Sequence, residues 1–214
     1  MRSQHNELPQ LAAKLLVDGS ARDFASAKRK AAAALGVTSQ RELPDNRTLL
    51  SALIGYQQLF DLAAVTARNV QLRTAALNAM AFFRDFNPHL VGAVMVGSTL
   101  AHSAVTLHLF ADETEQLSRF LLDAKIVFRV SGTALRVRRH TTERFTVYDV
   151  WFKDIEFKLV VMPLRSLFNP PLNPVDGAPY RRLGPTQLRT LLASARAGAV
   201  CDDIDTDILP HRLV

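Results

Sequence analysis

The chain has a single cysteine and no long apolar segment. Cys201 stands alone among 214 residues, which excludes an internal disulfide and any zinc site built from several cysteines. No stretch of about 18 uncharged apolar residues occurs, so we expect no membrane span and no membrane partner. The opening MRSQHNELPQ contains no apolar core of the secretory type, so we expect no signal peptide. Together these absences favour a cytoplasmic protein.

Motifs of several well-known enzyme classes are also missing. The chain contains no G-x-G-x-x-G, no G-x-S-x-G and no H-E-x-x-H, which argues against a dinucleotide fold, a hydrolase elbow and a zincin site. The stretch Gly92–Thr99 has the glycine spacing of a phosphate-binding loop but lacks its lysine. The four residues between its glycines are apolar, and we therefore expect a buried strand that ends at Gly97-Ser98.

The composition is that of a folded, basic protein. Apolar residues make up 48% and charged residues 21% of the chain, which excludes a disordered polymer. The net charge is +6, and residues 1–90 hold 11 basic against 7 acidic side chains, so most of the excess lies there. Its densest run is Lys28, Arg29 and Lys30, which is either a solvated helix face or a nucleic-acid-binding surface.

The first 88 residues carry helical periodicity. Leu8, Leu11, Leu15 and Leu16 recur at the spacing of one helix face. Further helices are expected over residues 22–35, 46–60 and 61–86. Asp45 or Asn46 caps the third helix, and Asn87-Pro88 ends the fourth, because the residue before proline disfavours helix.

After Pro88 the pattern changes to short runs typical of strands. Strands are expected at residues 91–96, 105–110, 125–130, 133–138, 145–152 and 155–162, and a helix at 113–123. Ser131-Gly132 predicts the hairpin turn between two of these strands. The four prolines of residues 169–179 predict an irregular segment that wraps the surface, followed by a helix that begins at Pro185.

These patterns predict an α+β protein in which a helical N-terminal domain packs on a mixed β-sheet. The expected units are residues 1–88, 89–168, 169–199 and an acidic tail, 200–214. Tyr148, Trp151 and Phe152 belong to an apolar strand, so we expect them in the core rather than on a base-stacking surface.

The order of parts around Gly97-Ser98 resembles the palm of the nucleotidyltransferase superfamily. Gly-Ser is followed by the strand Ser103–Phe110, a helix and a later strand, Ile155–Val161. The stretches GSTLAHSAVTLHLFAD and NPVDGAP are also similar to those of a family of small proteobacterial proteins. Members of that family are often labelled nucleotidyltransferases, and some carry a UDP-N-acetylmuramate–alanine ligase label. The ligase label is inconsistent with this chain, which is short and has no lysine-bearing glycine-rich loop.

The resemblance implies a catalytic chemistry that this chain only partly supports. In the superfamily, two acids at i and i+2 on one strand and a third on a neighbouring strand hold two Mg²⁺ or Mn²⁺ ions. Here Ala104 and Thr106 occupy the first two positions, and Lys158 falls near the third. Asp112 and Glu156 are then the remaining catalytic candidates.

Two interpretations of the neighbouring residues stay open. His108, Asp112 and Glu156 form a rebuilt metal site, or else His108 is a half-buried strand residue and Asp112 caps the next helix. The resemblance also implies a set of nucleotide- and phosphate-binding candidates, supplemented by an arginine pair whose forked side chains suit phosphate. The set is Gly97, Ser98, Ser103, Thr106, Lys158, Arg136 and Arg138.

The function expected from these residues is nucleotide or nucleic-acid binding with a weakened or lost catalytic metal site. An active form would transfer a nucleoside monophosphate to a hydroxyl group with Mg²⁺ or Mn²⁺, and an inactive form needs no cofactor. The alternative is a non-catalytic scaffold that binds RNA or protein through the helix carrying Lys28, Arg29 and Lys30. A third possibility is a site completed by a partner protein or a second copy of the chain.

Overall fold

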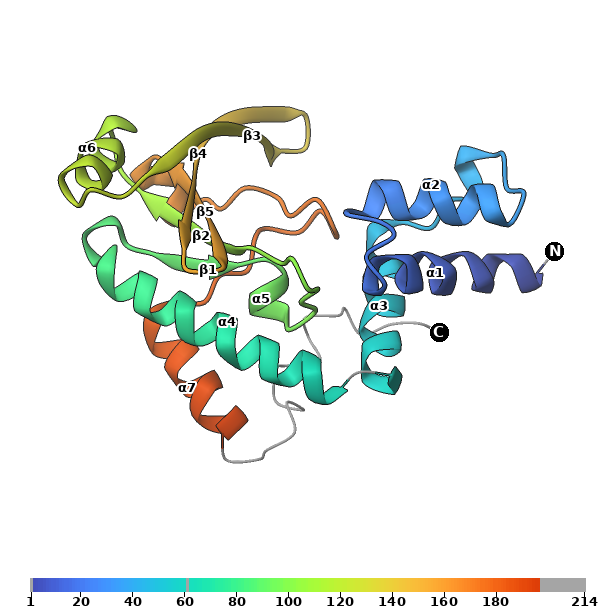
Figure 1. Cartoon of the computed structure of the whole chain (residues 1–214). Helices are drawn as coiled ribbons and strands as arrows, with labels where there is room; N and C mark the ends of the chain where they lie inside the picture. Colours follow the sequence, from blue (N-terminus) through green and yellow to red (C-terminus); the bar gives the residue numbers. More distant parts are fainter. Residues whose placement is uncertain (1, 61, 197–214) are drawn as a thin grey trace.

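The computed structural model describes residues 2–60 and 62–196, and it is an α+β fold (Figure 1). Three N-terminal helices stand beside a five-stranded mixed sheet that further helices cover on one face. The predicted acidic tail, 200–214, and Cys201 lie outside the described residues.

The N-terminal helices α1 (Arg2–Val17), α2 (Phe24–Ala34) and α3 (Asn46–Phe60) form a core of their own. Asp23 begins α2 with a capping box, in which its carboxylate accepts from the Ser26 amide. Asp45 plays the same part for α3 by accepting from the Thr48 amide at 2.7 Å. Many of the side chains in this shared core are small. Its fully buried members include Ala12, Ala13, Ala27, Ala31, Leu49 and Leu53.

The sheet contains one parallel and three antiparallel pairings, in the order β1-β2-β5-β4-β3. Its strands are β1 (His89–Val91), β2 (Val105–Phe110), β3 (Phe128–Arg138), β4 (Thr141–Phe152) and β5 (Ile155–Met162). The parallel pair is β2 with β5, and its register sets Thr106 beside Lys158.

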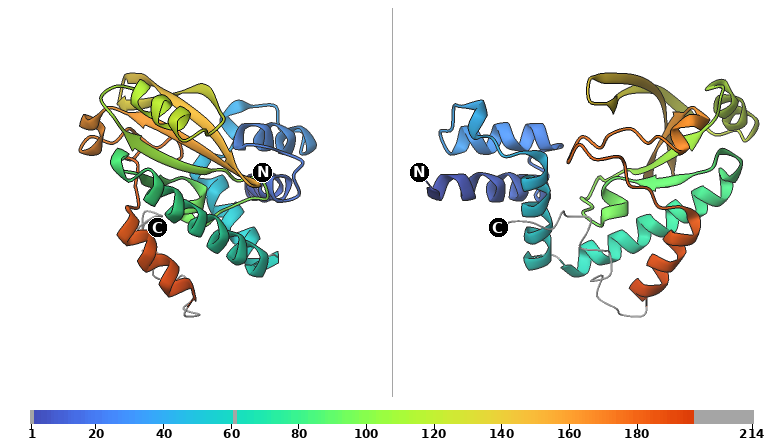
Figure 2. Two further views of the ribbon diagram at one scale, coloured as in Figure 1. Left: turned by 60° about the vertical axis from the view of Figure 1, so that its left-hand side comes forward. Right: turned by 180° about the vertical axis from the view of Figure 1, so that it is seen from behind.

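One face of the sheet is covered by helices. Buried side chains of α4 (Leu62–Phe82), α6 (Glu115–Asp123) and α7 (Pro185–Arg196) join those of the strands in the largest core cluster. Figure 2 shows α4 and α7 side by side along this face. The buried side chains of α4 therefore pack with the sheet, whereas the separate helical core consists of α1 to α3.

The opposite face, which we call the open face, carries a smaller apolar cluster at one end and polar groups at the other. Phe110, Phe145, Val147, Val160 and Met162 make up the apolar end. The 3-10 helix η3 (Leu164–Leu167) and residues 169–184 cross this end. The polar end lies toward the β4–β5 hairpin.

Two local expectations were wrong. Ser131 and Gly132 lie inside β3, opposite Val147 and Thr146, and β3 ends at Arg138, three residues before β4 begins. Gly97-Ser98 follows a single helical turn, α5 (Ala93–Val96), and β1 already ends at Val91. Short apolar runs have no periodicity that separates a buried strand from a buried helical turn.

No single helix of the described residues is long and apolar enough to cross a membrane. The bent pair α3 and α4, with 114° between them, meets the length and composition test only when the two are taken together.

Candidate functional site

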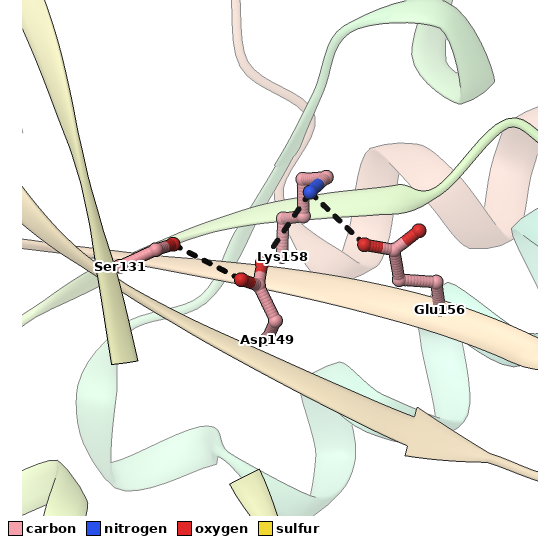
Figure 3. A network of polar contacts seen from close by, with 4 residues as sticks. All are labelled: Ser131, Asp149, Glu156 and Lys158. Carbon is pink, nitrogen blue, oxygen red and sulfur yellow. Dashed lines mark hydrogen bonds and ion pairs between the residues drawn. The ribbon is translucent and has the colours of Figure 1, made fainter. Parts of the chain in front are cut away.

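A chain of polar side chains crosses the open face where β3, β4 and β5 lie side by side (Figure 3). The Lys158 ammonium contacts Glu156 Oε1 at 2.9 Å and Asp149 Oδ1 at 3.4 Å. The other Asp149 oxygen, Oδ2, accepts a hydrogen bond from the Ser131 hydroxyl at 3.0 Å. We call Ser131, Asp149, Glu156 and Lys158 the polar cluster.

The strand register explains why these side chains meet. Asp149 lies directly opposite Lys158 in the β4–β5 pair, and directly paired residues project to the same face. Glu156 precedes Lys158 by two residues, so both side chains project to one side of β5. Thr106 flanks Lys158 from the parallel strand β2. The cluster is therefore fixed by the backbone pairing of three adjacent strands, β3, β4 and β5, and β2 flanks it.

Lys158 is held in its charged form. Partial burial lowers its pKa, but the hydrogen bond to Glu156 and the charges of Asp149 and Glu156 outweigh this, so the pKa is raised. Asp149 is only 7% exposed, and a buried carboxylate needs such a partner. An ammonium has three N–H donors, and two are directed at Asp149 and Glu156.

The expected metal-binding trio does not come together. His108 is 1% exposed and its ring packs against that of Tyr180, with 5.0 Å between centroids. Asp112 is exposed beyond the end of β2, while Glu156 belongs to the polar cluster. Across residues 2–60 and 62–196, no three His, Cys, Asp or Glu side chains are grouped so that they could hold a metal ion.

The alternative interpretation, in which His108 is half-buried and Asp112 caps the next helix, is also wrong. His108 is fully rather than half buried, and burial lowers its pKa to about 3. Thr114, not Asp112, stands at the start of α6, and the Thr114 side chain makes no capping bond.

The two amides of the Gly97-Ser98 turn are already hydrogen-bonded within the chain. Both amides donate to the Ala93 carbonyl, at 2.8 and 3.1 Å. Gly97 has φ +87°, which residues other than glycine rarely adopt, and a Cβ there would lie in tight contact with Arg73 Nη2, at 3.0 Å. Because the amides turn back onto α5, they do not form an anion cradle, and Ser98 is itself only 4% exposed, so this turn does not present the expected phosphate contact.

Two polar residues of α4, neither of them expected from the sequence, hold this turn. Arg73, 2% exposed, donates through Nε to Val94 O and through Nη2 to Met95 O, each at 3.0 Å. Asn69 donates to Gly97 O at 2.7 Å. The sequence feature that could have identified them is the i, i+4 spacing of two polar side chains on the apolar stripe of α4.

The remaining phosphate-binding candidates differ in burial and in hydrogen bonding. The Ser103 hydroxyl accepts from the Leu100 amide at 2.8 Å, so it stabilises the turn before β2. Thr106 is half-buried beside Lys158. Arg136 and Arg138 are exposed at the end of β3, and the register shifts between them.

The basic run on α2 is largely engaged within the chain. Lys28 donates to Asn46 Oδ1 at 2.8 Å, and burial lowers its pKa although Asp45 opposes the shift. Lys30 donates to the Ser20 carbonyl. Arg29 is exposed. Two of the three cations expected to face a nucleic acid therefore contact protein instead.

The aromatic residues at the end of β4 differ from the expectation. Tyr148 is buried, at 5% exposed, as predicted, but Trp151 is 49% and Phe152 67% exposed. The strand runs past the covered part of the sheet, so its last two side chains lie outside the core clusters, and the Lys153 ammonium lies over the Phe152 ring, 5.9 Å from its centroid. The Arg129 guanidinium lies over the Trp151 ring, 5.6 Å from its centroid.

Comparisons of the chain with family models, with curated proteins and with solved structures found no match.

Proposed function

We propose that the chain binds a nucleotide, or one nucleotide unit of a nucleic acid, on the open face without transferring it. The observation that supports this proposal is the place of Lys158. It stands beside Thr106 in the β2–β5 register, where the resemblance to nucleotidyltransferases leads us to expect the third metal-binding acid.

The proposed contact replaces metal ions with fixed cations. Mg²⁺ requires several oxygen ligands, whereas residues 104 and 106 are alanine and threonine. The third N–H of Lys158 and the exposed guanidinium of Arg129 are the donors we assign to the phosphate. Arg129 lies opposite Asp149 in the β3–β4 register, so both cations lie in one row across the sheet. Asp149 lies between the two cations in this row, and Glu156 already contacts Lys158 from the next row, so we expect modest affinity.

A loss of transfer activity belongs to the same proposal. Transfer requires metal ions that activate the attacking hydroxyl and stabilise the leaving pyrophosphate. Asp112 and Glu156, the candidate catalytic acids, lie in different surroundings, and Glu156 is already paired with Lys158 at 2.9 Å. A cytoplasmic site of action, which the single cysteine favours, is also part of the proposal.

A thermal-shift panel tests the proposal. We expect at least one of ATP, CTP, GTP and UTP to raise the melting temperature. For that nucleotide, the shift in EDTA should equal the shift in Mn²⁺. A ligand at a hundred times its dissociation constant stabilises the folded state by about 2.7 kcal/mol. A shift seen only with Mn²⁺ would favour a working metal site, and the absence of any shift would remove nucleotide binding from the account.

The scaffold alternative has less support, because Lys28 and Lys30 donate to Asn46 and Ser20. Salt dependence separates the two proposals. A surface that makes several phosphate contacts along RNA weakens steeply between about 50 and 200 mM salt, whereas binding of one nucleotide in the polar cluster does so much less.

A further inference from the structure

Trp151 is the single tryptophan of the chain and lies at the rim of the polar cluster. It pairs directly with Glu156 across β4 and β5, so the indole and the Glu156 carboxylate project to the same face. The next residue, Phe152, projects to the opposite face because side chains alternate along a strand. The open face therefore combines one half-exposed aromatic ring with two carboxylates and two cations.

Resting on the proposed function, we propose that the Trp151 indole is the stacking platform for the nucleobase of the bound nucleotide. Exposed aromatic rings beside cationic groups are the usual partners of unpaired bases. The Glu156 carboxylate then accepts a hydrogen bond from the base. Its Oε1 atom contacts Lys158, and a carboxylate has further acceptor sites on both oxygens.

This acceptor gives the platform a base preference. Cytosine, adenine and guanine carry an exocyclic amino group that donates to a carboxylate, and uracil has a carbonyl oxygen at the matching position. We therefore assign the site to nucleotides with an amino-bearing base. Hydrogen bonds to a charged group make the largest differences of this kind, about tenfold or more in affinity.

Arg129 now covers the ring at 5.6 Å, and the base must compete with it. An exposed cation–π contact changes an equilibrium by a factor of about 2–5. Stacking of a base on an aromatic side chain changes it by a factor of about 5–150. Stacking is therefore the stronger contact, and the displaced guanidinium becomes available to the phosphate, which its fork fits well.

The single tryptophan makes the test direct. Its fluorescence is followed in EDTA while CMP, UMP or ribose 5-phosphate is added, and calorimetry measures binding independently. We expect CMP to quench the fluorescence, UMP to bind about tenfold more weakly, and ribose 5-phosphate to leave the signal unchanged because it has no base.

Variants separate stacking from simple exposure. We expect Trp151→Ala to weaken CMP binding by about 5- to 150-fold, and Trp151→Phe to retain most of it. Phe152→Ala is the matched control, since it removes a neighbouring exposed ring on the other face and should leave binding unchanged. Circular dichroism confirms that each variant is folded.

The outcomes distinguish this inference from the proposed function. CMP binding by calorimetry with unchanged fluorescence, or with unchanged affinity in Trp151→Ala, would overturn the platform and leave nucleotide binding in place. Equal binding of CMP and UMP would overturn the role of Glu156. No binding of any of these ligands, nor of the nucleoside triphosphates, would overturn both.

Discussion

Replacing Arg73 with leucine is expected to lower the free energy of unfolding by about 3 kcal/mol. The last carbonyls of a helix have no partner within it, and α5 is only four residues long. Arg73 supplies the missing donors to Val94 O and Met95 O, and it does so from a buried position. Each buried carbonyl left without a partner costs about 1–3 kcal/mol.

Urea unfolding measures this effect. Arg189→Leu, on the exposed side of α7, is the control and should change stability by less than about 0.5 kcal/mol. If Arg73→Leu is as stable as the control, α5 and the Gly97-Ser98 turn do not depend on the hydrogen bonds from Arg73 of α4. Because that turn leads into β2 and Thr106, we also expect the variant to bind nucleotide more weakly.

Acidification is expected to destabilise the protein through His108. Burial, together with the charges of Arg182 and His89, lowers the folded-state pKa of His108 to about 3, against about 6.5 in the unfolded chain. The unfolded state therefore binds a proton below pH 6.5 that the folded state does not take up. Stability is lost as the pH falls from 6.5 toward 3, by about 2 kcal/mol from this group between pH 7.5 and pH 5.

The His108 contribution is isolated by comparing the chain with a His108→Leu variant, which cannot titrate at this position. Unfolding free energies of both proteins are measured in urea at pH 7.5 and pH 5. We expect the original chain to lose about 2 kcal/mol more than the variant over this interval. Equal losses in the two proteins would mean that His108 becomes protonated in the folded state as readily as in the unfolded one.

The sequence predicted regular periodic elements well and local exceptions poorly. The α+β class and the N-terminal helices follow from periodicity, and Asp45 was one of the two residues expected to cap the third helix. The hairpin was misplaced because Ser131-Gly132 is a common turn pair, while tertiary pairing with Val147 and Thr146 keeps it in β3. Residues 93–96 were misassigned because the partner that stabilises their turn, Arg73, is about twenty residues away in the sequence.

The candidate site was predicted only in part, because its contacts also depend on residues that lie far apart in the sequence. The resemblance led us to expect Lys158 near the position of the third acid, and the β2–β5 register sets it beside Thr106. Asp149 was not expected, because only the β4–β5 register shows which residue of β4 lies opposite Lys158. Its contact with Ser131 also requires the continuous β3 that the misplaced turn would have broken. The exposure of Trp151 depends on how far β4 extends beyond the covered part of the sheet, which composition does not reveal.

The central claim is that Lys158 binds the phosphate of a nucleotide in place of metal ions. Calorimetric titration of CTP in EDTA tests it most directly, with a double variant, Asp149→Asn and Lys158→Met, that leaves no buried carboxylate without a partner. Lys14→Met, on the exposed side of α1, removes the same charge elsewhere. We predict about tenfold weaker binding for the double variant, since a charged hydrogen bond contributes about 1.5–3 kcal/mol, and unchanged binding for Lys14→Met. Equal affinities in all three proteins, or binding only when Mn²⁺ is added, would contradict the claim.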